Sequence, residues 1–327
     1  MKKIFLFLLS IVLFTSTSCG DDIKRSSMGA PFEVLLVCDD DVWDSSAGMA
    51  LKEALDTPVP GLPQQEASFK VTRRNYKDFG ITEQAFRNII IVDINSNHEK
   101  CEFRFENDIY AEPQVVMGIY APDKRSFGEF VHKNSKTIVD FFTKKEREVQ
   151  IMELEKLHNR NILSLVKKMF GCEIMIPADI NGRKVGKDFI WISDYNNRSK
   201  NEIQSFAIYS YPYTSPEDLS REQFIQKRNY FMKENIQGSE PDSYIQTVNS
   251  SVSIKEAKFN GHRMIIARGS WYMENDDMFG GGPFVSHSIV DEKNGRVIVV
   301  EAFVYAPNKE KRRFIRKLEA SLYTLKF

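Results

Sequence analysis

The acidic stretch CDDDVWD at residues 38–44 carries the side chains best suited to chemistry in this sequence. It follows EVLLVC, whose uninterrupted apolar residues predict a buried strand. Carboxylates at the carboxyl end of such a strand can bind a hard cation, so Asp39, Asp41 and Asp44 are candidate ligand or metal contacts. We favour the alternative, a solvated loop whose acids stabilise the start of the next helix, because an acidic cluster is a common loop composition.

Other chemically suggestive residues lack the spacing that catalysis needs. Ser286, His287 and Ser288 alternate as in a strand, so the serines share a face that the histidine does not. The sequence has no G-x-S-x-G elbow. The cysteines show no C-x-x-C spacing and the histidines no H-x-x-x-H, which argues against a structural zinc site. We therefore predict no catalytic residue, no metal and no cofactor.

Tyr209, Tyr211 and Tyr213 recur at a period of two, on one face of a predicted strand. Together with Trp191 and Trp271 they form a candidate aromatic surface for a ligand. The alternative is half-buried sheet packing, which we favour because tyrosine is a good strand residue.

The amino terminus has the pattern of a secretory signal. Two lysines precede an apolar run at 4–14, which is too short for the ~20 residues of a membrane-spanning helix. Small polar residues and then Cys19 follow, an arrangement that resembles the bacterial lipobox. We predict a lipoprotein signal peptide over 1–18 and attachment of acyl chains such as palmitate at Cys19, which would bind the chain to a bilayer.

Residues 19–31 are polar and contain Gly, Ser and Pro, so they are predicted to form a flexible tether. Asp21 and Asp22 resemble the acidic signal that sends some lipoproteins to the cell surface, and equally suit a solvated tether. The expected location is the Gram-negative envelope, at the outer membrane, facing the periplasm or exposed on the surface. The chain has 45 basic and 45 acidic residues, so it has no electrostatic reason to bind nucleic acid.

The pattern of elements predicts an α+β fold with antiparallel sheets flanked by helices. We expect an N-terminal α+β domain over 32–145, a connecting helix over 146–171 and a C-terminal α+β domain over 172–327. Predicted helices include 126–142, 146–170, 221–235 and 309–325, and predicted strands include 33–38, 88–94, 115–120, 205–211, 263–273 and 296–305. Asn260-Gly261 and Asn294-Gly295 are predicted hairpin turns.

A short repeat links the two halves. YAPDK at 120–124 and YAPNK at 305–309 each follow a predicted strand and precede a predicted helix. Asp123 and Asn308 are both suited to cap that helix. Convergence on one turn would explain the match, but we favour duplication of an α+β unit.

Longer segments, among them FRNIIIVDI, FVHKNSKTIVDFF, LVKKMFGCEI, IYSYPYT and GGPFVSHSIVDEKNGRVIVVEAFVYAP, resemble the DUF4837 family of Bacteroidetes lipoproteins. The resemblance extends over nearly the whole mature chain. It implies a place in the cell envelope and brings no site residues, because the function of that family is unknown. The C-terminal half also resembles the PsbP/Mog1 fold in its order of elements.

These observations favour a non-enzymatic envelope lipoprotein that binds a protein, a glycan or another envelope component. The alternative is a membrane-anchored hydrolase or metal-dependent enzyme centred on residues 39–41. The enzyme requires a deep cleft where Asp39 or Asp41 meets a histidine or other polar groups, whereas the binding protein requires a groove or an apolar patch.

Overall fold

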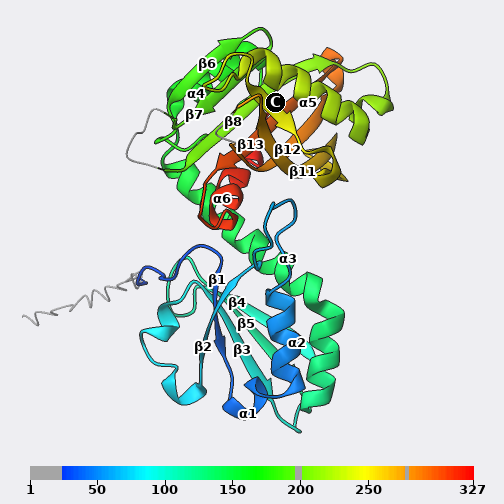
Figure 1. Cartoon of the computed structure of the whole chain (residues 1–327). Helices are drawn as coiled ribbons and strands as arrows, with labels where there is room; N and C mark the ends of the chain where they lie inside the picture. The colour runs from blue at the N-terminus through cyan, green and yellow to red at the C-terminus, as the bar shows by residue number, and fades with distance from the viewer. Residues whose placement is uncertain (1–23, 196–200, 277–279) are drawn as a thin grey trace, which may run out of the picture.

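The computed structural model describes residues 24–195, 201–276 and 280–327 (Figure 1). The predicted signal peptide and Cys19 lie outside these ranges. Within them the chain forms a five-stranded sheet in its N-terminal half and an eight-stranded sheet in its C-terminal half, joined by helices. The predicted α+β class is confirmed.

The N-terminal sheet is mixed and mainly parallel. Its strands are β1 (Glu33–Val37), β2 (Lys70–Arg74), β3 (Asn88–Ile94), β4 (Glu102–Asn107) and β5 (Val115–Ala121), in the order β2-β1-β3-β5-β4. All pairs are parallel except β4 with β5. The antiparallel arrangement predicted for both halves is therefore wrong here. The uninterrupted apolar runs of β1 and β3 are typical of strands that are buried on both faces of a parallel sheet.

The two faces of this sheet are covered differently. Helices α2 (Ser46–Leu55) and α3 (Lys124–Lys156) pack on one face. On the other face, Leu35, Val37, Ile89 and Val116 are buried beneath loops that contain the single turns η1 (Tyr76–Asp78) and η2 (Glu83–Ala85). In the described part of the chain this second face, which we call the loop-covered face, carries no α-helix (Figure 1).

The segment before β1 is attached to the N-terminal half from Lys24 onward. Ser26 forms a parallel bridge with Glu112, and Met28 forms one with Phe86. The Lys24 ammonium donates to the carbonyl of Asp108 at 2.5 Å. The flexible tether predicted over 19–31 is therefore wrong for residues 24–31, because their backbone groups pair with two loops of the body.

Helix α3 continues through the point where the sequence predicts a break. It spans 33 residues, and α4 (Arg160–Phe170) begins after a short turn. The predicted helices over 126–142 and 146–170 are wrong in their boundaries, because nothing at 143–145 interrupts helical hydrogen bonding. Asn159 ends that turn and accepts from the amide of Ile162 at 3.1 Å, which caps α4.

The C-terminal sheet is antiparallel, as predicted. Its main order is β10-β11-β12-β13-β8-β7-β6, and β9 pairs with the far end of β11. The strands are β6 (Gly182–Gly186), β7 (Phe189–Ser193), β8 (Ile203–Pro212), β9 (Tyr244–Thr247), β10 (Ser253–Phe259), β11 (His262–Glu274), β12 (Gly281–Asp291) and β13 (Arg296–Tyr305). Helices α4 and α6 (Arg312–Leu322) cover one face, and α5 (Arg221–Asn235) covers the other.

The short repeat does not reflect duplication. The two halves differ in strand order and in strand direction. Asp123 caps α3 as predicted, accepting from the amides of Arg125 and Ser126 at 2.9 Å. Asn308 caps no helix: it has a φ of 58°, and α6 begins at Arg312. The shared letters therefore mark two different turns.

The halves meet at a loop over 57–69 that docks on α6 and β11. The Glu66 carboxylate accepts from the amides of Lys311 and Arg312 at 2.7 and 2.8 Å, at the start of α6. Gly61, with a φ of +82°, lies so near β11 that a Cβ there would be 2.8 Å from that of Arg268. Arg316 of α6 donates to the carbonyl of Ser68 at 2.8 Å.

Candidate ligand pocket

An apolar pocket of about 280 Å³ lies on the face of the C-terminal sheet that α5 covers. The sheet supplies Trp191 of β7, Ile203 and Ser205 of β8, Trp271 and Met273 of β11, and Phe303 and Tyr305 of β13. The connection from α5 to β9 supplies residues 236–239, and β9 adds Ile245. The pocket therefore lies between a sheet face and the connection over residues 236–239, which we call the crossing segment.

Two indole side chains line this pocket. The Nε1 atoms of Trp191 and Trp271 are buried, and neither has a hydrogen-bond partner in the described part of the chain. A buried donor without a partner costs about 1–3 kcal/mol, because it has lost its hydrogen bond to water. Because protein atoms cover both Nε1 atoms, Trp191 and Trp271 contribute apolar ring surface to the pocket wall.

The polar rim is small. Ser239 donates to the Asp276 carboxylate from its amide at 3.4 Å and from its hydroxyl at 3.2 Å. Gly238 lies against the same carboxylate, where a Cβ would be 2.6 Å from Oδ2 and 2.5 Å from the methyl carbon of Met273. This close approach holds the crossing segment against the sheet.

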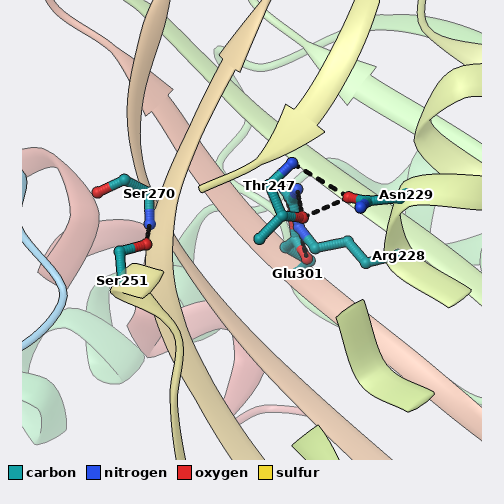
Figure 2. Close-up of polar contacts among 6 residues, drawn as sticks. All are labelled: Arg228, Asn229, Thr247, Ser251, Ser270 and Glu301. Carbon is teal, nitrogen blue, oxygen red and sulfur yellow. Dashed lines mark hydrogen bonds and ion pairs between the residues drawn. The ribbon is translucent and has the colours of Figure 1, made fainter. Parts of the chain in front are cut away.

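A buried ion pair fixes the helix that precedes the crossing segment (Figure 2). Arg228 of α5 donates to Glu301 of β13 from Nε and Nη2, at 2.8–3.0 Å, and both side chains are fully buried. The Arg228 guanidinium lies 4.1 Å from the ring centroid of Phe284. Burial raises the pKa of the Glu301 carboxyl, and the adjacent guanidinium opposes that rise.

The same network holds β9 (Figure 2). Arg228 Nη1 donates to the Thr247 hydroxyl at 2.9 Å, and Asn229 accepts from the Thr247 amide at 3.1 Å. Beyond it, the Ser270 amide donates to the Ser251 hydroxyl at 2.8 Å, which ties the chain after β9 to β11. Because α5 and β9 flank the crossing segment, these contacts position one wall of the pocket.

The predicted aromatic surface is partly wrong. Tyr209 and Tyr211 are buried in the core beneath α5, and Tyr213 packs at its border, so the three do not present rings to a ligand. Burial raises the pKa of the Tyr209 hydroxyl well above its usual value. Trp191 and Trp271 do line the pocket. Phe303 and Tyr305 were missed, although their period of two along β13 is the signal that could have indicated them.

The predicted acidic site is not enclosed. Asp39, Asp41 and Asp44 are exposed to solvent. Lys124 pairs with Asp41 at 2.6 Å, and its hydrogen bond holds the pKa of that carboxyl below its usual value. The intervening Asp40 pairs with Arg73 of β2. Among the residues that the structure describes, no group of three or more His, Cys, Asp or Glu side chains is placed to hold a metal ion.

His287 lies on the opposite face from the pocket, buried against the ring of Tyr323. Burial lowers its pKa to about 4. Ser286 pairs in register with Glu301 and so shares the α5 face, which confirms that serine and histidine face opposite ways.

The chain belongs to the family described as "Domain of unknown function (DUF4837)", whose profile matches residues 159–324, just over half of the sequence. Residues 27–155 match a different profile, "Domain of unknown function (DUF8532)". The sequence predicts a resemblance to DUF4837 over nearly the whole mature chain, and this prediction is wrong in its extent. The DUF4837 profile matches the C-terminal half alone.

Among solved proteins, a crystal structure from Bacteroides thetaiotaomicron VPI-5482 is similar at 13% sequence identity, with a TM-score of 0.25. The alignment covers 47% of this chain and 44% of that one, so this chain matches under half the length of that protein. A search of curated proteins gives no match. The likeness to PsbP/Mog1 stays a prediction.

Proposed function

We propose that this protein is a non-enzymatic lipoprotein of the Gram-negative cell envelope that binds a small, mostly apolar molecule in the pocket of its C-terminal half. The observation that carries the binding role is a preformed apolar pocket whose wall includes the aromatic side chains of Trp191, Trp271 and Phe303. Such cavities with a few polar groups are the usual form of small-molecule sites.

The anchored location is supported by the sequence. A charged start, a short apolar run and Cys19 after small residues agree with a lipoprotein signal. Among the described residues, no helix is both long and apolar enough to cross a bilayer. Replacing Cys19 with Ser should move the protein from the membrane fraction to the soluble fraction.

An enzyme centred on residues 39–41 receives less support. Asp39 and Asp41 are exposed, and the carboxylate of Asp41 pairs with an exposed lysine. The hollow beside them, of about 370 Å³, is lined by Asp40 and by residues 73–75, 77 and 78, and neither Asp39 nor Asp41 lines it.

The pocket is tested with the neutral fluorescent probe N-phenyl-1-naphthylamine. Ile203 lines the pocket and is half-buried, so Ile203→Trp should fill the cavity and weaken probe binding by about tenfold or more, equal to about 1.4 kcal/mol. Ile254 of β10 is also half-buried beneath α5 but lies outside the pocket lining, so Ile254→Trp is the matched control. Equal binding by both variants would contradict the proposed site.

A further inference from the structure

The segment that leads to the proposed anchor is short. Lys24 lies five positions after Cys19, and it is already held against the loop at Asp108. Five residues span at most ~17 Å when fully extended. A unit of about 100 residues has a radius of gyration of about 13 Å, so this reach is less than the width of the N-terminal half. An acylated Cys19 therefore keeps the body beside the bilayer.

The surface near this attachment point is the loop-covered face. Parallel sheets are normally covered by helices on both faces. Here the apolar side chains of the second face are covered by loops and by the half-buried rings of Phe79, Phe86 and Tyr110. Residues 24–28 run along two of these loops through the bridges to Glu112 and Phe86. The segment that leads to Cys19 and the loop-covered face thus lie on the same side of the N-terminal half.

Large apolar side chains are exposed in these same segments. Met28, Ile81 and Ile109 are 42%, 77% and 40% exposed. Met28 is bridged to Phe86. Ile81 lies in the turn before η2, where the Gln84 amide donates to the carbonyl of Gly80 at 3.0 Å. Ile109 belongs to the loop that Glu112 joins to Ser26. Single exposed apolar residues are ordinary in soluble proteins. Three such residues in segments that pair with the chain next to the attachment point need an explanation.

We propose that the loop-covered face of the N-terminal sheet lies against the lipid bilayer, with Met28, Ile81 and Ile109 in the interfacial region. This inference depends on the lipid anchor proposed above, because the short segment brings this face to the membrane. Apolar side chains that insert into the interface add binding energy to that of the acyl chains. The C-terminal half and its pocket remain free to receive a ligand.

The experiment uses the acylated chain in vesicles of phosphatidylethanolamine and phosphatidylglycerol, with and without brominated phospholipid, which quenches nearby tryptophan. The variants are Ile81→Trp and Ile109→Trp. The control is Met49→Trp, because Met49 is 55% exposed on α2, on the helix-covered side of the same half. The fluorescence added by each new tryptophan is measured against the parent chain, and thermal unfolding verifies that each variant folds.

We expect loss of the added fluorescence for Ile81→Trp and Ile109→Trp and none for Met49→Trp. Flotation of the parent chain with vesicles, abolished by Cys19→Ser, tests the anchor separately. A chain that floats without loss at residues 81 and 109 overturns the contact and leaves the anchor standing. A parent chain that does not float overturns both. A sedimenting dimer that Ile81→Asp converts to a monomer would assign this face to a second copy and also overturn the proposal.

Discussion

At the scale of single residues, the Arg228–Glu301 pair is the most constrained polar contact near the pocket. Neither side chain reaches solvent, so removing one partner leaves a buried charge without compensation. We expect Arg228→Met to lower the free energy of unfolding by about 3–5 kcal/mol in urea titrations. The double variant Arg228→Met, Glu301→Leu should be more stable than Arg228→Met alone, because it removes both charges.

The control for this prediction is the exposed pair of Arg125 and Glu129 on α3. Arg125→Met should change stability by less than about 0.5 kcal/mol, because exposed ion pairs contribute little. If the double variant at 228 and 301 proved no more stable than the single variant, an unpaired buried charge would not be the cause of the loss.

His287 predicts an acid dependence of stability. Its folded-state pKa is lowered to about 4 by burial, opposed by Glu319 and reinforced by Arg268 and Arg147. The unfolded chain gains this proton as the pH falls below about 6.5, while the folded chain does not until about pH 4. The free energy of unfolding should therefore fall by about 2–3 kcal/mol between pH 7 and 4.5 because of this residue.

His287→Phe keeps a ring against Tyr323 and removes the titration. Urea unfolding at the two pH values should show a smaller loss for this variant than for the parent chain. His132→Phe, at an exposed position of α3, should keep the parent slope. An unchanged slope in His287→Phe would mean that other groups cause the acid dependence.

At the scale of elements, sequence patterns predicted the C-terminal half better than the N-terminal half. The predicted helix over 221–235 matches α5 at both ends, and the strand over 296–305 matches β13. Asn260 and Gly261 have φ values of 49° and 87°, as the predicted hairpin turn requires. Antiparallel neighbours joined by such turns are encoded locally. The parallel pairing of β1 with β3 joins residues more than fifty positions apart, which no local signal specifies.

The residues of the candidate site also come together through long-range strand pairing, which local sequence patterns do not specify. Trp191 and Trp271 are in the predicted aromatic surface, but their partners from β8, β13 and the α5–β9 connection come together only through the order of strands in the sheet. Tyr209 and Tyr211 have the same strand period as Phe303 and Tyr305, yet α5 covers the first pair and leaves the second beside a cavity. Which aromatic residues line the pocket therefore depends on which of them α5 covers.

The contact between Glu66 and the start of α6 helps to hold the two halves together. A carboxylate that accepts two amides at a helix start is stabilised by hydrogen bonding and by the helix dipole. Glu66→Gln should cost about 1–2 kcal/mol and speed hydrogen exchange at the amides of Lys311 and Arg312. Glu53→Gln, at an exposed position of α2, is the control and should leave that exchange unchanged. Unchanged exchange in Glu66→Gln would contradict the docking role.

At the scale of the whole molecule, the two halves have separate roles in this account. The N-terminal half carries the attachment segment and the loop-covered face, and the C-terminal half carries the pocket. Helix α3 and the docking of the 57–69 loop on α6 connect them. A body held at a membrane by one half and open to a ligand in the other suits a binding lipoprotein of the envelope.

The central claim is that the pocket takes a ligand, and the chain's three tryptophans allow a direct measurement. Trp191 and Trp271 line the pocket, while Trp43 lies in the N-terminal half beside Lys52. In ¹⁵N–¹H spectra of chain labelled at the indole nitrogens, N-phenyl-1-naphthylamine should shift the signals of Trp191 and Trp271 and leave that of Trp43 in place. A probe that binds without moving either pocket signal, or that moves Trp43 alone, would contradict the account.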